Sequence, residues 1–496
     1  MFTTKKICLA SMLYLLSFFA FSQMGSETLH NKSIPSIHGF FPKVDASFVG
    51  DPMPIFADGV FNIFYLNDIR GGSDLGVHAV HLLTSSDLYH YTNHSEVLPY
   101  INDVNNPELL LGTGSFIKVG DTWHAWYTAH NANVFPVESV MHATSSDKIN
   151  WVKHYQDTIL PGKNYSGNDF RDPHVVWIPE KQQYWMLITT RQNGKGVIVK
   201  YSSTDLKNWQ DDGVFFDNDT ISNDSNLECP TLVFFNNKWY LSFSDQWPTR
   251  LTQYRVADNP EGPFVKLKNY AVDGAGFYAG KLAMKDDHLY VFGWNPTKSS
   301  SKDSGNIDWA GNLVAHELIQ NSDGSLSSVI PTELNNVINS LPNNSKLLKP
   351  NSLKNNITTK FDTLNMQIYD VMPSSAVIEG TIKGASHGII FNFGINENKL
   401  VNAPLNIVLN KAVNKVFFYN SPLAALSTAK PELGTPVDLS GDIHLKILIE
   451  NSIAVFYIND KAAFTARMYD MVNNKWGLSY SINDNPTIEL NIKEIK

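Results

Sequence analysis

Three acidic residues in this sequence each stand next to or near a proline where an apolar, β-branched run begins. They are Asp51 in "FVGDPMPIF", Asp172 in "DFRDPHVVW" and Glu228 in "NLECPTLVFF". A charge at the point where a strand enters a hydrophobic core needs a partner or a task. Carboxyl groups can serve as acid, base or nucleophile, so the pattern first suggests acid–base chemistry on a bound substrate.

Cleavage of a glycosidic bond fits such a set. It needs one carboxylic acid to protonate the leaving oxygen and one carboxylate as nucleophile or base, and a further anion stabilises the cationic transition state. Arg171 adjoins Asp172 and is expected to hold it ionised for contact with sugar hydroxyls. Glu228 has apolar neighbours that suit a general acid. Asp51 then becomes the nucleophile.

Structural roles are the alternatives for these residues. Arg171 and Asp172 could form a structural ion pair at the start of a strand, and Asp169 fits a turn cap equally well. Cys229 has no histidine beside it, and we expect it to pack within its strand. The only other cysteine is Cys8, near the N-terminus, so no disulfide framework, metal site or cofactor is expected.

A repeat indicates which elements position the acids. The stretches "TSSDLYHY" (84–91), "TSSDKINW" (144–151) and "SSTDLKNW" (202–209) recur at spacings of 60 and 58 residues. Fixed periods of this size are typical of repeat architectures. The aspartate of each copy is expected to make hydrogen bonds within a turn.

The strand pattern between the repeats predicts a β-propeller. Residues 173–215 contain four short β segments separated by turn residues, which is typical of one blade. The first strand of each blade lines the central channel, so acids remote in sequence should meet at one end of it. Blade starts predict five blades within residues 35–334, beginning at Asp51, Gly112, Asp172, Glu228 and Asp273.

A second domain follows. The segment 335–356 is rich in Asn, Ser, Pro and Lys, which favours a linker. Residues 357–496 contain eight strand-like segments, among them "GIIFNFGI" and "KVFFYN", and predict an antiparallel β-sandwich. The fold class expected is therefore all-β, with a five-bladed propeller followed by a C-terminal sandwich.

The N-terminus and the charge favour an exported protein. Residues 1–22 contain Lys5 and Lys6, an apolar run and then small residues, and predict a cleavable signal peptide, so a secreted or periplasmic location is expected. Removing two lysines takes the net charge from −9 to −9 − 2 = −11. This charge argues against nucleic acid or an anionic membrane as partner. No membrane span and no obligate protein partner are expected, only an oligo- or polysaccharide substrate.

Several motifs resemble those of family-32 glycoside hydrolases, the invertase, inulinase and levanase group. "RDP" (171–173) and "ECP" (228–230) are similar to two of its signatures, and "GDPMP" (50–54) falls at its Asn-Asp-Pro-Asn-Gly box. Further similar stretches are "LGTGSF" (111–116), "DGAGFYAG" (273–280), "DWAGNLVAHEL" (308–318) and, in the second domain, "IENSIAVFYINDKAAFTARMY" (449–469).

The resemblance implies a five-bladed propeller with a sandwich, retaining hydrolysis of β-fructofuranosides and no metal. It implies that Asp51 is the nucleophile, Asp172 the transition-state stabiliser and Glu228 the acid/base. The chain departs from the family pattern where "FVG" and "MP" flank Asp51 and where "FYLND" (64–68) lacks a glutamine. Candidates for substrate contact are Arg171, Ser115, Asp273, Tyr278 and Trp247, with His130 at the channel rim.

Three functions remain open. The first is a secreted, retaining β-fructofuranosidase acting on sucrose, inulin or levan. The second is an inverting α-L-arabinofuranosidase or arabinanase on a related propeller, which differs in the separation of its carboxyl groups. The third is an inactive propeller that binds glycans, an alternative disfavoured by the presence of all three acids.

Overall fold

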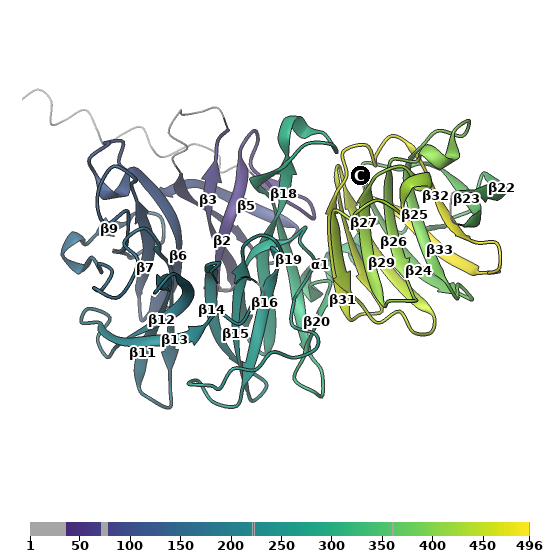
Figure 1. Cartoon of the computed structure of the whole chain (residues 1–496). Helices are drawn as coiled ribbons and strands as arrows, with labels where there is room; N and C mark the ends of the chain where they lie inside the picture. Colours follow the sequence, from purple (N-terminus) through teal and green to yellow (C-terminus); the bar gives the residue numbers. More distant parts are fainter. Residues whose placement is uncertain (1–35, 71–77, 221, 223, 360–361, 496) are drawn as a thin grey trace, which may run out of the picture.

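The computed structural model describes residues 36–70, 78–220, 222, 224–359 and 362–495. The predicted signal peptide lies outside these residues. Within them the chain is nearly all β with a single α-helix, α1 (Thr332–Ser340), and the two parts of the chain lie side by side (Figure 1). None of the helices described is both long and apolar enough to cross a membrane.

The first part consists of antiparallel strand groups. One nine-stranded sheet holds β1–β5 and β17–β20, and separate sheets hold β6–β9, β10–β13 and β14–β16. The strands are β1 (Ser36–His38), β2 (Phe48–Ala57), β3 (Val60–Asp68), β4 (Ala79–Ser85), β5 (His90–Leu98), β6 (Leu110–Val119), β7 (Thr122–His130), β8 (Glu138–Ser145), β9 (Val152–Lys153), β10 (Phe170–Ile178), β11 (Gln183–Gln192), β12 (Lys195–Ser203), β13 (Gln210–Asp217), β14 (Leu227–Phe235), β15 (Lys238–Asp245), β16 (Thr252–Ala257), β17 (Tyr278–Lys285), β18 (His288–Lys298), β19 (Ile307–Gln320) and β20 (Leu326–Val329).

The inner strands form a closed ring. Strand β2 contacts β6, β6 contacts β10, β10 contacts β14, β14 contacts β17, and β17 returns to β2. The first and last groups also join through β19 and β2, whose ladder consists of the single pair Gly311–Val49. This arrangement is consistent with a propeller. The last group begins at Tyr278, so the start predicted at Asp273 is five residues too early.

A β-bulge interrupts the ladder at the start of every inner strand. The register shifts between Gly50 and Met53 in β2, and β10 and β14 shift at the same place in their strands. Strands β6 and β17 do so too. A bulge re-aims side chains, and its unpaired position tolerates a proline that cannot donate to the ladder. Positive φ angles mark the bulges at Asp51 (31°), Asp172 (59°), Cys229 (54°) and Ala279 (52°).

The repeated aspartates make turns, as predicted. Asp87 Oδ1 accepts hydrogen bonds from the backbone N–H groups of residues 89 and 90. Asp147 and Asp205 accept the equivalent pairs in their own copies. These bonds lower the pKa of Asp147 to about 2 despite slight burial. The prediction of turn aspartates is confirmed, and the repeat is structural.

The second part contains two packed antiparallel sheets, as a sandwich requires. One has the order β21-β33-β24-β29-β30-β31 and the other β22-β23-β32-β25-β26-β27-β28. Their strands are β21 (Lys346–Leu347), β22 (Ser352–Thr358), β23 (Thr363–Val371), β24 (Ser375–Lys383), β25 (Gly388–Ile395), β26 (Leu405–Asn410), β27 (Lys415–Asn420), β28 (Leu433–Pro436), β29 (Ile443–Glu450), β30 (Ile453–Ile458), β31 (Ala462–Arg467), β32 (Lys475–Ser481) and β33 (Thr487–Glu494).

The segment predicted as a linker is more ordered than its composition indicated. It includes most of α1, and β21 and β22 already belong to the sandwich sheets. Leu334 and Ile338 of α1 are buried in a hydrophobic cluster that both parts share. Residues 335–356 therefore connect the two parts while packing against both.

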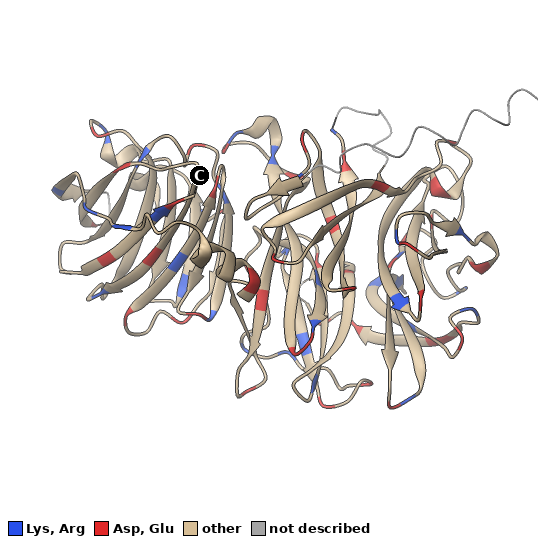
Figure 2. Cartoon of the chain, turned by 180° about the vertical axis from the view of Figure 1, so that it is seen from behind, with Lys and Arg blue, Asp and Glu red and all other residues tan. Residues whose placement is uncertain are grey.

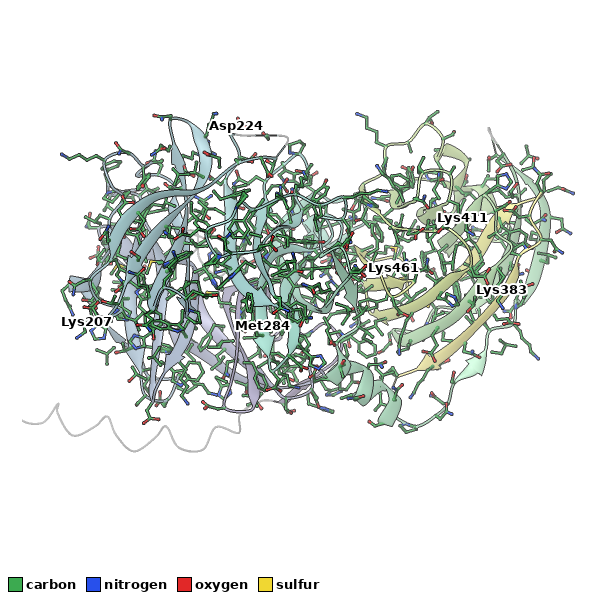
Figure 3. The ribbon with its side chains drawn as sticks, turned by 90° about the horizontal axis from the view of Figure 1, so that it is seen from below. Lys207, Asp224, Met284, Lys383, Lys411 and Lys461 are labelled. Carbon is green, nitrogen blue, oxygen red and sulfur yellow. The ribbon has the colours of Figure 1, made fainter. Side chains whose placement is uncertain are left out.

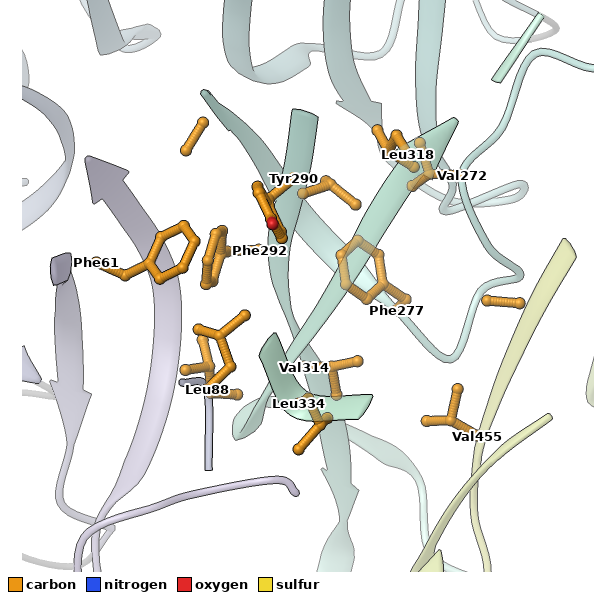
Figure 4. Close-up of a cluster of buried hydrophobic side chains, with 14 of the residues drawn as sticks. Phe61, Leu88, Val272, Phe277, Tyr290, Phe292, Val314, Leu318, Leu334 and Val455 are labelled. Carbon is orange, nitrogen blue, oxygen red and sulfur yellow. The ribbon is translucent and has the colours of Figure 1, made fainter. Parts of the chain in front are cut away.

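A continuous hydrophobic core joins the two parts. One buried cluster contains Phe61 of β3 and Tyr290 of β18 from the first part, Leu334 of α1, and Val455 of β30 from the second part (Figure 4). Seen from below, the two parts abut, with Lys207 at the outer end of the first and Lys383 and Lys411 on the second (Figure 3). Basic and acidic residues are interspersed on both (Figure 2).

Polar contacts reinforce the joint between the parts. Glu450 of β29 accepts hydrogen bonds from the backbone N–H groups of Phe40 (3.3 Å) and Phe41 (2.9 Å). Arg467 of β31 donates to the carbonyl oxygens of Asn295 (3.0 Å) and Pro296 (2.6 Å). These contacts lie beside the seam between the first and last strand groups.

Candidate active site

The three acids singled out from the sequence line one cavity. Asp51 comes from β2, Asp172 from β10 and Glu228 from β14, and the cavity among them has a volume of about 340 Å³. All three stand at or next to the bulge of their strand. The bulges therefore turn acidic side chains of three strand groups toward one space, as the propeller hypothesis predicted.

Asp51 is held by two neutral donors. Trp294 Nε1 donates to Oδ1 at 2.9 Å, and Thr113 Oγ1 donates to Oδ2 at 2.8 Å. Burial raises the pKa of Asp51, the bonds from Trp294 and Thr113 oppose this shift, and the nearby Glu228 carboxylate adds to it. Both oxygens are thus oriented before any substrate arrives.

Asp172 is the most deeply buried of the three acids, with 4% of its surface exposed. Its Oδ2 accepts a hydrogen bond from the backbone N–H of Cys229 (2.9 Å), and its own N–H donates to Thr128 Oγ1 (2.9 Å). Burial raises the pKa of Asp172 to about 7, although Arg171 opposes the shift. Glu228 and Asp51 raise it further.

Arg171 binds carboxylates other than the one predicted. Its Nη2 lies 2.9 Å from Glu228, and its Nη1 lies 3.0 Å from Asp169 and 3.2 Å from Glu138. The distance from Nε to Asp172 Oδ2 is 3.9 Å. Arg171 does oppose the rise in the pKa of Asp172, as expected, but its closer ion pairs are with Glu228, Asp169 and Glu138. The bulge at Asp172 breaks the regular alternation of side chains along β10, and Arg171 reaches across to Glu228 on β14.

Glu228 receives three hydrogen bonds. Its Oε1 accepts from Arg171 and from Gln246 Nε2 (2.9 Å), and its Oε2 accepts from the Tyr278 hydroxyl (2.6 Å). Burial raises the pKa of Tyr278 well above its ordinary value, so this hydroxyl keeps its proton. The Arg250 guanidinium lies over the Tyr278 ring at 4.3 Å.

A second cavity of about 470 Å³ adjoins the first and shares Glu228 and Trp309 with it. Trp247 lines it with 58% of its surface exposed, above the Arg250 guanidinium at 5.7 Å. Exposed indole rings beside charged side chains suit the stacking of a sugar ring. The site therefore has a carboxylate-lined inner cavity and an aromatic outer one.

Two residues predicted to contact substrate lie elsewhere. Ser115 lines a different cavity further along the inner strands, and its Oγ accepts a hydrogen bond from the Val175 N–H (3.1 Å). Asp273 is buried at the joint between the two parts, where it bonds Thr465 and His316. Both positions correct the expectation, because neither side chain faces the carboxylate cavity.

Several residues of the cavity had no signal of their own in the sequence. Thr113 takes the position expected for Ser115, since the bulge in β6 shifts which residue faces inward. Glu138 accepts hydrogen bonds from the Phe170 N–H (2.7 Å) and from Arg171, and lies 3.2 Å from His130 Nδ1. His130 does line the cavity, in agreement with its rim assignment.

Three carboxylates, guanidinium groups and aromatic rings around a sugar-sized cavity are typical of a glycoside hydrolase. In the described ranges, no group of three or more His, Cys, Asp or Glu side chains could hold a metal ion. The family description "Glycosyl hydrolases family 32 N-terminal domain" matches residues 43–328, more than half of the chain. The chain belongs to glycosyl hydrolase family 32.

Individual relatives are distant. A sucrose-6-phosphate hydrolase of Streptococcus mutans is 28% identical over 198 residues, 38% of this chain and 40% of that protein. A levanbiose-producing levanase of Bacillus subtilis is 28% identical over 214 residues, 39% and 38% of the two chains. These matches span about two fifths of each relative. An invertase of Schizosaccharomyces pombe is 23% identical over 86% of this chain and 78% of its own.

Solved structures show the same fold over nearly the whole chain. A sucrose-6-phosphate hydrolase from Lactobacillus gasseri superposes with a TM-score of 0.71 at 19% identity, covering 93% of both chains. An exo-inulinase from Aspergillus awamori gives a TM-score of 0.71 at 16% identity, covering 94% of this chain and 99% of its own. The likeness therefore extends through both parts.

Proposed function

We propose that this chain is a retaining β-fructofuranosidase with Asp51 as nucleophile, Asp172 as transition-state stabiliser and Glu228 as acid/base. The observation that carries the proposal is that these three acids, each placed by a strand bulge, line one cavity. Family membership supports fructosides as the substrate class. The five strand groups are proposed to be five propeller blades.

In the first step, the Glu228 carboxylic acid protonates the glycosidic oxygen while an Asp51 oxygen attacks the anomeric carbon. The glycosidic electron pair leaves with the departing sugar, and a fructosyl ester of Asp51 remains. In the second step, Glu228 removes a proton from water, which attacks the same carbon and releases the Asp51 carboxylate. Trp294 and Thr113 donate hydrogen bonds to Asp51, and these bonds stabilise the carboxylate as it leaves.

Asp172 is proposed to bind sugar hydroxyls as a carboxylate, where its negative charge stabilises the developing cation. Its pKa of about 7 means that in the empty site about half of the Asp172 carboxyl groups are protonated at pH 7, and most are ionised only above that pH. A bound sugar whose hydroxyl groups donate hydrogen bonds to Asp172 would favour the ionised form, because hydrogen bonds to a charged carboxylate lower its pKa.

The aromatic cavity is proposed to hold the departing sugar. Glu228 borders both cavities, so its carboxyl group lies where a bond between two sugar units would cross from one to the other. Trp247 is then expected to stack on the unit that leaves. A cleavable signal peptide at residues 1–22 is proposed to export the enzyme toward polymeric or extracellular sugar.

The test is to incubate the protein with sucrose, inulin and levan at several pH values and to separate the products by chromatography. Release of free fructose supports the proposal, and proton NMR of the first-formed anomer distinguishes retention from inversion. Inverted product, or release of arabinose from arabinan instead, would favour the related arabinanase-type function. Binding of fructans without turnover would favour an inactive glycan-binding protein.

A further inference from the structure

A lysine lies buried along the channel that leads away from the carboxylates. Lys281 is three residues after Tyr278 on β17, and only 3% of its surface is exposed. Its Nζ donates a hydrogen bond to the carbonyl oxygen of Gly114 at 2.6 Å. It lines a cavity of about 230 Å³ to which all five inner strands contribute, with Met53, His174 and Thr231 among its neighbours.

An isolated buried ammonium group is costly unless opposite charge compensates it. No carboxylate in the described part of the chain lies within ion-pair distance of Lys281. Burial lowers the pKa of Lys281, and the nearby Cys229, Asp172 and Asp51 oppose this shift. Burial raises the pKa of Cys229 well above its ordinary value, so the thiol stays neutral. The compensating charge therefore comes chiefly from Asp51, because Asp172, with a pKa of about 7, is only partly ionised at neutral pH.

Asp51 needs a cation that its direct contacts do not provide. Its two hydrogen-bond partners, Trp294 and Thr113, are neutral. Arg171 is fully engaged, since it binds Glu228, Asp169 and Glu138. With carboxylates crowded into one cavity, the ionised form of each is disfavoured unless positive charge is near. Lys281 lines the neighbouring cavity and not the carboxylate cavity, and its Nζ binds the carbonyl oxygen of Gly114, the residue after the Thr113 that holds Asp51. It can therefore supply positive charge without occupying the substrate space.

We propose that Lys281 is a positioning residue of the hydrolase, whose buried ammonium group stabilises the ionised Asp51 from within the channel. The inference rests on the proposed role of Asp51 as nucleophile. Lys281 acts through Asp51 and does not touch the sugar. Because Lys281 is buried, its charge is screened less than a charge at the surface and acts over a longer distance.

Other charged groups in the channel set the background for this effect. The ring of His174 stays neutral, because burial and, to a smaller extent, Lys281 together lower its pKa to about 3. The other titratable groups near Asp51 and Lys281 come from the elements packed around them. They are Asp172 and His174 on β10, Glu228 and Cys229 on β14, Tyr278 on β17 and Arg250 before β16.

The first experiment compares Lys281→Met and Lys281→Gln with the wild type in the pH dependence of kcat/KM. Both variants remove the charge, whereas glutamine retains a donor for the Gly114 carbonyl. The acidic limb reports ionisation of Asp51 and of Asp172, since both are proposed to act as carboxylates and both interact with Lys281. We expect it to move to higher pH by about one unit in both variants, a tenfold loss of kcat/KM on that limb. Thr231→Val, in the same cavity and without change of charge, is the control and should keep the wild-type profile.

Two outcomes would overturn the inference. One is a profile of unchanged shape in both Lys281 variants. The other is a shift in Lys281→Met that Lys281→Gln does not share, which would indicate a role for the hydrogen bond alone.

A second experiment does not depend on turnover. Thermal unfolding of Lys281→Met, Asp51→Asn and the double variant at pH 7 forms a double-mutant cycle. If Lys281 compensates Asp51, the loss of melting temperature caused by Lys281→Met should shrink clearly in the Asp51→Asn background. Additive losses would contradict the inference. Since this readout needs no substrate, it remains valid even if no fructoside is cleaved and the proposed function fails.

Discussion

Two buried aspartates of this chain have almost equal exposure and opposite surroundings. Asp172 in the carboxylate cavity is 4% exposed, and Asp273 at the joint between the two parts is 2% exposed. Asp273 accepts hydrogen bonds from the N–H of Gly274 (2.5 Å) and from the N–H (3.0 Å) and hydroxyl (2.5 Å) of Thr465, and lies 3.1 Å from His316 Nε2. Asp172 has one backbone donor and two acidic neighbours.

The difference separates a structural carboxylate from a functional one. Asp273 is surrounded by donors from both parts of the chain, so its charge is satisfied before any ligand binds. Asp172 is left short of donors beside an open cavity, and a ligand with hydroxyl groups can complete its hydrogen bonds. Burial alone does not distinguish the two residues, whereas the number and source of donors does.

The strongest test of the functional side is Asp51→Asn. The amide retains an oxygen for Trp294 or Thr113 but cannot form the covalent intermediate. We expect kcat for fructoside hydrolysis to fall by about 10⁴-fold or more, with an unchanged circular dichroism spectrum. Turnover within tenfold of the wild type would exclude Asp51 as nucleophile.

Asp172→Asn should separate activity from stability. Because the folded-state pKa is raised from 3.8 to about 7, the folded chain holds a proton there that the unfolded chain releases. Stability therefore falls as pH rises from about 4 to 7, and an asparagine removes this loss. We expect a higher melting temperature than the wild type at pH 8, equal values near pH 4, and a loss of kcat of about 10²-fold or more. A lower melting temperature at pH 8 would contradict this account.

Asp273→Asn should have the reverse signature. Its amide group places N–H donors against the donors of Thr465 and His316, which leaves buried groups unpaired. We expect the free energy of unfolding to fall by about 1–3 kcal/mol in urea titrations at pH 7, while KM stays unchanged. A changed KM with an unchanged free energy of unfolding would indicate that Asp273 contacts the substrate.

Tyr278→Phe removes one of the three donors on Glu228. The hydroxyl donates to Oε2 at 2.6 Å, so its loss leaves the carboxyl group less firmly oriented. We expect kcat to fall by about tenfold, with the melting temperature within a few degrees of the wild type. Wild-type kcat would show that Arg171 and Gln246 suffice for the orientation.

The smallest effect is expected for Trp247→Ala. Its ring is largely exposed, so unfolding should be unaffected. If the ring stacks on the departing sugar, KM for inulin should rise by about three- to tenfold, with little change in kcat. The matched control is Trp177→Ala, another exposed tryptophan (43%) on β10 that lines none of the cavities described above. Equal effects of the two changes would argue against a sugar contact at Trp247.

The sequence was informative where local chemistry and period coincide. An acid next to or near a proline recurs at the start of three strand groups, and the first strand of each blade lines the channel, so Asp51, Asp172 and Glu228 could be placed together. The bulges that turn these side chains were seen only in the structure. Turn aspartates and most sandwich strands were equally readable, because they depend on neighbouring residues. The family resemblance was likewise confirmed by the profile match.

Partnerships across strand groups could not be read in the same way. Arg171 adjoins Asp172 in sequence, yet its guanidinium pairs with Glu228 on another strand. Ser115 lies two residues from Thr113, which bonds Asp51. Asp273 resembled a blade start, although two of its hydrogen bonds come from Thr465 in the second part. Each of these outcomes depends on which distant segment packs alongside, and that is set by the tertiary fold.

The joint between the two parts affects how the ring of inner strands stays closed. The ladder that links its beginning to its end is the one pair Gly311–Val49, far weaker than the ladders within each group. Glu450 and Arg467 form hydrogen bonds with the backbone on either side of this single pair. The C-terminal part therefore holds the first and last strand groups together. Deleting it should let these two groups separate at this pair and should lower the catalytic activity, although no catalytic residue is removed.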